Sequence, residues 1–430
     1  MPSTASSQTG SAAPSCDDLV HRFRSVRGHT EQLRAPLSAE DCVAQSMDDA
    51  SPTKWHLAHT SWFFETFVLE PGLSGYRPFH PDFRVLFNSY YQQVGPQHPR
   101  PRRGLLTRPS LDEVLAYRAH VDAQVLELLA HGNGRAEPLA AVIELGLHHE
   151  QQHQELILTD AKHLLGANPL RPAYSPRPTH GVRAGAAPRS RWRRYPGGVH
   201  EIGDAGRTFA FDNERPRHAT LLQPFALAAR LVTNAEFVAF IDDGGYTRPE
   251  LWLSDGWAAV QSRGWSAPLY WERRDGGWEQ FTLAGQRTLA PDEPVCHVSL
   301  YEADAYATWA GARLPSETEW ETVASAVRVA GNLLDSGRLH PSAAPSGDGV
   351  QQLFGDVWEW TRSAYGPYPG YRPPTGPLGE YNGKFMCNQF VLRGGSCVTP
   401  ATHIRGTYRN FFPPDARWQF SGVRLARDLD

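Results

Sequence analysis

Apolar residues recur at helical spacing along the first part of the chain. The spacing predicts helices over Leu111–Leu129, over Leu139–Leu165, roughly over Thr53–Leu69 and within Cys16–Leu33. Ser110 suits the N-cap of the first of these, and the second begins after Pro138 and ends at Gly166. Four long helices with polar residues turned inward are typical of a helical bundle, which builds metal sites between facing helices.

The second part of the chain, after Trp192, is rich in Gly, Pro and Trp. Short β-type runs lie at Gly198–Gly203, Ala219–Phe225, Val391–Gly395 and Gly422–Ala426, with helical segments at Asn234–Asp242 and Leu300–Ala310. We therefore predict an α+β protein. Its parts are a disordered tail over 1–16, a bundle over 17–167, a Pro/Arg-rich linker over 168–191 and an irregular α+β domain over 192–430.

Composition and charge narrow the class of protein. The chain has 430 residues and a net charge of −4, which argues against a dedicated binder of nucleic acid or of an anionic membrane. No run of about 18 apolar residues is present, so no membrane span is expected. The first residues lack a secretory signal and the five cysteines are few and odd in number. We expect a cytoplasmic protein with free thiols and small-molecule partners.

The stretch His149-Glu150-Gln151-Gln152-His153 carries the strongest chemical signal. Histidines four residues apart lie on one face of a helix, and neutral imidazole is the commonest protein metal ligand. An isolated pair of this kind is more often structural. Here it stands in a polar block, His148–Glu155, inside a helix otherwise rich in Leu, Ile and Val. Burying so many polar groups is costly without partners, so we expect a site.

A third ligand is available from the earlier helix, which carries His56 and His59. His59 lies one helical turn from both Trp55 and Trp62, so it shares an inward aromatic face with them. One ligand from this helix and two from the later one would give a three-ligand site with open positions, which indicates catalysis. Three imidazoles suit zinc, iron or copper, and the spacing does not decide between them.

The same stretch reads as H-E-x-x-H, the signature of zinc metalloproteases. Those enzymes need a further ligand downstream, either a Glu or a second histidine motif. After His153 the chain continues with Leu156–Leu158 and His163, and the linker contains no acid before Glu201. We therefore do not favour proteolysis.

Several motifs in this order resemble one family, the iron-dependent sulfoxide synthases of ergothioneine biosynthesis (the EgtB family), with an ovothiol relative. They are Trp55–His59, His149–Glu155, Arg313–Glu321, Gly355–Trp360, Leu392–Ser396 and Phe420–Arg424, and the resemblance covers residues 17–428. It implies a DinB-like four-helix bundle joined to a domain similar to formylglycine-generating enzyme, with a C-type-lectin-like fold.

The resemblance implies Fe(II) held by His59, His149 and His153. The reaction it implies is oxidative C–S bond formation, in which oxygen couples a cysteine-type thiol to C2 of the imidazole of Nα-trimethylhistidine (hercynine). Three neutral ligands leave open positions on the metal, so imidazole, thiolate and oxygen can share it.

Further roles follow from the same resemblance. Gln152 matches an active-site glutamine that hydrogen-bonds substrate, and the spacing of Arg100 and Arg103 resembles an arginine pair that binds the thiol substrate's carboxylate. Tyr90 and Tyr91 match a tyrosine pair that acts as active-site acid in one branch of the family. The plain alternatives are a solvated basic loop and two core tyrosines.

Trp418, Gln419 and Phe420 match a C-terminal loop that reaches over the iron in the family. Aromatic faces receive a trimethylammonium group well, so Trp418 is the first candidate for that contact, followed by Phe411 and Phe412. Another branch of the family places a carboxylate in this loop to bind the amine of γ-glutamylcysteine. This chain has none there, which favours free cysteine.

Three alternatives stay open. Selenoneine synthase shares the architecture and joins hercynine to a selenosugar, and γ-glutamylcysteine remains a possible donor. A non-catalytic protein that binds metal and ligand would consume no oxygen. Formylglycine-generating activity is not expected, because that enzyme needs a paired-cysteine copper site that we cannot match here.

Overall fold

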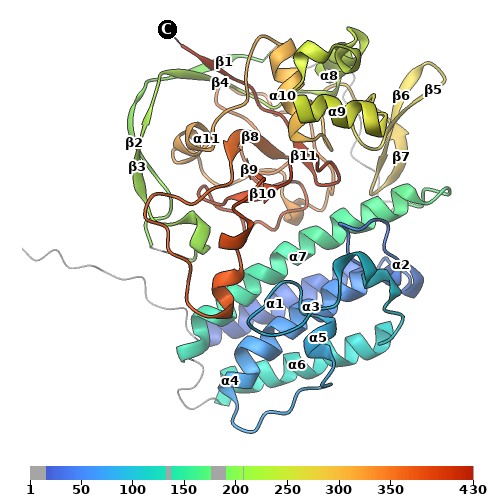
Figure 1. Ribbon diagram of the computed structural model, residues 1–430, viewed down its shortest axis with the longest axis vertical. Helices are drawn as coiled ribbons and strands as arrows, with labels where there is room; N and C mark the ends of the chain where they lie inside the picture. Colours follow the sequence, from blue (N-terminus) through green and yellow to red (C-terminus); the bar gives the residue numbers. More distant parts are fainter. Residues whose placement is uncertain (1–15, 132–136, 176–189, 207, 430) are drawn as a thin grey trace, which may run out of the picture.

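The computed structural model describes residues 16–131, 137–175, 190–206 and 208–429. Within these residues a helical bundle lies against an irregular α+β domain, and helix α7 runs between the two (Figure 1). This confirms the predicted α+β fold class. The predicted tail over 1–16 lies outside the described residues except for Cys16, which begins the first helix, and residues 176–189 of the predicted linker also lie outside them.

The bundle contains the helices predicted from apolar spacing. Its helices are α1 (Cys16–Arg34), α2 (Ala39–Val43), α3 (Thr53–Phe64), α4 (Glu70–Gly72), α5 (Phe83–Leu86), α6 (Leu111–His131) and α7 (Ala140–Ala167). A π-helical turn, Glu65–Leu69, continues α3. Ser110 caps α6 as predicted, because its Oγ accepts the backbone N–H of Glu113 at 3.2 Å. In the described residues no helix combines the length and apolar character that a membrane span requires.

A close approach of α3 and α7 sets the distance between their functional side chains. At Gly146 on α7, a Cβ atom would lie 2.6 Å from the ring of Phe64 and 3.0 Å from the ring of Phe63, both on α3. The bare glycine therefore lets the two helices meet at a distance that any side chain would prevent. His149 and His153 follow one and two turns later on α7, facing α3.

A buried ionic network holds three of the bundle helices together. Glu150 on α7 is fully buried and accepts from Arg27 of α1 at 2.8 Å, from Thr30 of α1 at 2.7 Å and from Arg118 of α6. Burial alone would raise the pKa of Glu150, but the guanidinium groups of Arg118 and Arg27 lower it to about 2. The carboxylate is therefore ionised and paired inside the bundle.

The second domain is built from small sheets and short helices. Its strands are β1 (Trp192–Tyr195), β2 (Gly198–Ile202), β3 (His218–Leu222), β4 (Phe225–Ala228), β5 (Trp271–Arg274), β6 (Gly277–Thr282), β7 (Gly285–Thr288), β8 (Trp358–Ala364), β9 (Phe390–Arg393), β10 (Asn410–Phe412), β11 (Ser421–Gly422) and β12 (Ala426–Asp428). Its helices are α8 (Asn234–Asp242), α9 (Ser254–Arg263), α10 (Leu300–Trp309) and α11 (Glu317–Ala324).

The strands pair in four sheets within the described residues: β1-β4-β12, β10-β9-β8-β11, β2-β3 and β5-β6-β7. In the second of these, β9 pairs antiparallel with both β8 and β10, and β11 pairs parallel with β8. A fully buried pair, Glu359 with Arg424 at 2.8 Å, ties β8 to the C-terminal segment. This sheet carries Trp358 and Phe412, which reach the candidate site described below.

Three details differ from the sequence predictions. The run predicted over Ala219–Phe225 is two strands, because Pro224 has no N–H to continue the ladder. The run predicted over Gly422–Ala426 is instead the end of β11 and the start of β12. One residue in the described part of the predicted linker, Tyr174, is buried, and its hydroxyl donates to the carbonyl of Leu33 at 2.5 Å.

The ionic network gives a stability prediction. Glu150→Gln should lower the free energy of unfolding by about 3–5 kcal/mol, because it removes the only fully buried carboxylate that Arg27 and Arg118 share among the described residues and leaves them the more exposed Asp122 and Glu31. Glu144→Gln, on the same helix, should cost about 0–1 kcal/mol, since Glu144 pairs with Arg22 near the surface. Urea unfolding measures both, and equal losses would contradict the assignment.

The pH dependence follows from the lowered pKa of Glu150. Its stabilisation is fully present above the unfolded-state value of about 4.3 and is lost as the pH falls toward about 2. The stability difference between wild type and Glu150→Gln should therefore shrink over that interval.

Candidate metal centre and substrate cavity

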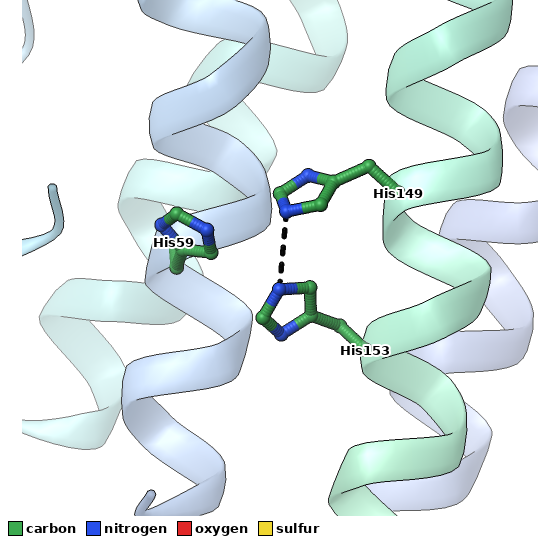
Figure 2. Close-up of side chains that lie close together, drawn as sticks. All are labelled: His59, His149 and His153. Atoms are coloured by element: carbon green, nitrogen blue, oxygen red, sulfur yellow. Dashed lines mark hydrogen bonds between the residues drawn. The ribbon is translucent and has the colours of Figure 1, made fainter. Parts of the chain in front are cut away.

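Three buried histidines meet between α3 and α7. His59 comes from α3, and His149 and His153 come from α7 (Figure 2). One ligand atom of each lies within 4.8 Å of the others, and Nε2 of His149 is 3.1 Å from Nε2 of His153. The structure thus brings together the three side chains that the sequence singled out as metal ligands.

The neighbours of His59 fix its orientation. Its ring stacks between Trp55 and Trp62, with ring centroids 4.6 and 5.4 Å away, as the one-turn spacing predicts. Its Nδ1 lies 2.6 Å from the carbonyl oxygen of Phe87. A carbonyl only accepts, so Nδ1 carries the hydrogen and Nε2 keeps its lone pair for a metal.

The three imidazoles are neutral at physiological pH. Burial lowers the pKa of His59 and of His153 well below the ordinary value, and it lowers that of His149 to about 3. Nδ1 of His149 is buried, and none of the described residues forms a hydrogen bond with it. Three neutral nitrogen ligands from two rigid helices fit a divalent transition metal of the zinc, iron or copper kind.

A cavity of about 390 Å³ opens beside these histidines, between the bundle and the second domain. Interfaces of this kind are common places for ligand sites. Besides the three histidines, the residues that line it include Ser51, Trp55, His56, Tyr90, Arg100, Arg103, Gln152, Glu155, Asp160, Trp358, Tyr381, Phe385, Tyr408, Phe411, Phe412 and Gln419.

The predicted arginine pair lies on the cavity wall. Arg103 is buried, its guanidinium carbon lies 3.3 Å from the ring centroid of Trp55, and its Nη1 donates to Oγ of Ser51 at 2.9 Å. Burial lowers the pKa of Arg103, the nearby positive charge of Arg100 lowers it further, and Asp160 opposes both. An anionic ligand would relieve this repulsion between two cations.

Gln152 also lies on the cavity wall, and two tyrosines hold its amide. Its Nε2 donates to the hydroxyl of Tyr408 at 2.6 Å, and the hydroxyl of Tyr381 donates to its Oε1. The ring of Tyr381 is 5.6 Å from that of His149. Sequence reasoning missed both tyrosines, because neither stands in a motif and loops far along the chain carry them.

Only one residue of the predicted tyrosine pair reaches the cavity. Tyr90 lines the cavity, whereas Tyr91 is fully buried against Trp62 and Phe67 and is not among the lining residues. The two rings stack, with centroids 4.7 Å apart. Burial raises the pKa of Tyr90, Tyr91 and Tyr381, so these phenols hold their protons at neutral pH.

Of the three residues predicted in the C-terminal loop, only Gln419 reaches the cavity. Gln419 lines the cavity, and both polar atoms of its buried amide lack a partner in the described part of the chain. Trp418 packs against Phe412 at 5.8 Å and does not line the cavity, and Phe420 is buried against His297 at 4.7 Å. The aromatic rings that do face the cavity from this part of the chain include Phe411 and Phe412.

The geometry also bears on the metalloprotease alternative. In that chemistry the Glu of H-E-x-x-H acts as a general base beside the metal. Here Glu150 does not line the cavity, and both carboxylate oxygens are occupied by Arg27, Arg118 and Thr30 in the bundle. The motif therefore lacks its base.

The chain matches known proteins over both of its parts. Residues 22–157 match the DinB superfamily, and residues 193–344 and 336–429 match the sulfatase-modifying factor enzyme 1-like domain. It is 34% identical to a hercynine oxygenase of Mycolicibacterium thermoresistibile, over 98% of this chain and 97% of that protein.

The chain is also similar to two further proteins whose names refer to hercynine or ergothioneine. The hercynine oxygenase of Mycobacterium tuberculosis is 35% identical, over 96% of this chain and 99% of that protein. Ergothioneine biosynthesis protein 1 of Schizosaccharomyces pombe is 28% identical, over 54% of this chain and 29% of that protein.

The histidine cluster gives a binding prediction. His59→Ala should weaken Fe(II) binding by more than about 100-fold, since loss of an outer-shell partner alone costs about 10–100-fold. His163→Ala, on α7 but bonded to Ser46 away from the cluster, should bind as wild type does. Anaerobic Fe(II) titration measures both, and unchanged binding in His59→Ala would refute the ligand assignment.

Proposed function

Because the chain belongs to the hercynine oxygenase (EgtB) family, we propose that it is a non-haem Fe(II), oxygen-dependent sulfoxide synthase of ergothioneine biosynthesis. Its substrates would be hercynine, cysteine and O2. The observation that carries the proposal is one cavity in which three neutral imidazoles, an arginine pair and several aromatic rings meet.

The overall reaction balances with these substrates alone. The thiol loses its S–H hydrogen, C2 of hercynine loses its hydrogen, and a C–S bond forms between them. One oxygen atom of O2 ends on sulfur and the other leaves as water, so O2 is the four-electron oxidant. Bound iron would supply the activation of O2 and a common point for the thiolate and the imidazole.

The residues of the cavity would bind and orient the two organic substrates. Arg100 and Arg103 would bind the carboxylate of cysteine, because guanidinium matches carboxylate geometry and no anionic side chain of the described residues pairs with either arginine. Phe411 and Phe412 would receive the trimethylammonium group of hercynine on their faces. These contacts would hold the reacting carbon near the metal-bound sulfur.

A cavity tyrosine would donate a proton to reduced oxygen. Tyr381 is the first candidate, since its ring lies 5.6 Å from that of His149 and Gln152 orients its hydroxyl. Tyr90 also lines the cavity and is the second candidate. Both phenols are protonated at neutral pH, as a general acid must be.

Free cysteine is favoured over γ-glutamylcysteine by the C-terminal loop. At the position of this loop that faces the cavity the chain has Gln419, a neutral amide, and not a carboxylate that would pair with a second ammonium group. Arg417 of the same loop contacts Glu302 at 2.8 Å.

The proposal is tested by product formation. The chain, loaded with Fe(II) without oxygen, should form hercynylcysteine sulfoxide when hercynine, cysteine and O2 are added, as read by mass spectrometry. γ-Glutamylcysteine and a selenosugar are run in parallel, and a preference for either would reassign the donor. Bound iron with no coupled product from any donor would refute the proposal.

The tyrosine assignment has its own test. Tyr381→Phe should slow sulfoxide formation by about 10²–10⁴-fold if its proton is used in the rate-limiting step, or divert oxygen to the thiol alone. Tyr91→Phe is the matched control, because that hydroxyl does not reach the cavity. Product ratios are measured for these and for Tyr90→Phe. Unchanged ratios in Tyr381→Phe and Tyr90→Phe would remove the tyrosine acid from the mechanism.

A further inference from the structure

Hydrogen bonds join His153 to a buried carboxylate through a second histidine. Nδ1 of His153 lies 2.8 Å from Nδ1 of His56, and Nε2 of His56 lies 3.1 Å from Oδ2 of Asp160. The exposed fractions of the three residues are 8%, 2% and 5%. Neither His56 nor Asp160 belongs to the ligand set or to the substrate contacts proposed above.

The carboxylate determines where each hydrogen of this chain lies. A carboxylate only accepts, so Nε2 of His56 carries the hydrogen that faces Asp160. In its neutral form His56 has a single N–H, so its Nδ1 then accepts and Nδ1 of His153 donates. Nε2 of His153 is then left with its lone pair, and this is the nitrogen that lies 3.1 Å from Nε2 of His149.

We propose that Asp160 and His56 are positioning residues that select the tautomer of His153 in which Nε2 binds the metal. The inference rests on the proposed iron-dependent function. A metal-bound histidine commonly donates its other N–H to an outer-shell acceptor, which orients the ring and raises its basicity. In this chain the outer-shell acceptor is itself a histidine, His56. Asp160 in turn accepts a hydrogen bond from the other nitrogen of His56.

Asp160 is itself fixed from a second side. The same Oδ2 accepts the backbone N–H of Ser51 at 2.8 Å, and Oγ of Ser51 accepts from Arg103 at 2.9 Å. One carboxylate oxygen therefore connects a metal ligand to the arginine proposed for the thiol substrate. Oδ1 of Asp160 has no hydrogen-bond partner among the residues that the structure describes, so within them Oδ2 alone acts as acceptor.

The test measures Fe(II) affinity without oxygen or hercynine, by competition with a chromophoric chelator. Asp160→Ala and His56→Phe should each weaken Fe(II) binding by about 10–100-fold. The double variant should bind Fe(II) about as weakly as whichever single variant has the lower affinity, because both changes break the same hydrogen-bond path. Asp160→Asn should retain most of the affinity, since its amide oxygen can take the place of Oδ2.

Two controls separate this role from a general loss of structure. Glu144→Ala removes a carboxylate from the same helix on the face toward α1 and should leave Fe(II) affinity unchanged. Ser51→Ala breaks the branch toward Arg103, so it should raise the KM for cysteine with Fe(II) affinity unchanged. Circular dichroism checks that each variant is folded.

Wild-type affinity in both Asp160→Ala and His56→Phe would overturn the inference, and so would an Asp160→Asn variant as weak as Asp160→Ala. A wild-type chain that binds no Fe(II) would overturn the inference and the proposed function together. Affinities that fall as expected in a chain that forms no coupled product would support the inference and refute the proposed function alone.

Discussion

Eight consecutive residues of α7, His148–Glu155, place polar side chains where water is largely excluded. Each of these side chains makes at least one hydrogen bond. Glu150 pairs with arginines of α1 and α6, and Gln154 donates to the carbonyl of Val26 on α1. Glu155 accepts from Trp358, Ser396 and Thr399 of the second domain, each at 2.7 Å. Desolvation is tolerated only because these partners surround the helix.

Hydrogen bonds of these buried polar groups also hold the second domain against α7. The face of α7 that meets the second domain contacts it through Gln151 with Thr402, His148 with His403, and Gln152 with Tyr408. His149 and His153 project from α7 toward α3 (Figure 2). The cavity therefore forms where neither domain alone would close it, and groups from both domains line it.

Helical rotation explains why an H-E-x-x-H string here lacks the chemistry of a protease. Residues 149 and 153 lie nearly one turn apart on one face, whereas residue 150 is turned about 100° away. In this bundle that direction points to the guanidiniums of Arg27 and Arg118. The same motif thus supplies two histidines of the candidate metal centre and one structural anion, and the packing around the helix decides which role the acid takes.

The sequence by itself determined the helical bundle, the capping of α6 by Ser110 and the placement of His149 and His153 on one helix face, because periodicity and one-turn spacing are local properties of the chain. His59 was joined to that pair through resemblance to a family. It also placed Arg100, Arg103, Gln152, Tyr90 and Gln419 near one site through resemblance to a family. Local patterns do not say which loops return to a helix from hundreds of residues away.

Only the tertiary structure brought Tyr381 and Tyr408 to Gln152 and turned Trp418, Phe420 and Tyr91 away from the cavity. These placements depend on how irregular loops of the second domain cross α7, and no spacing rule governs that. The hydrogen-bond path from His153 through His56 to Asp160 was also decided only by the tertiary structure. It joins α3 to α7 through side-chain contacts, which exist only once the two helices have packed at the distance that Gly146 allows.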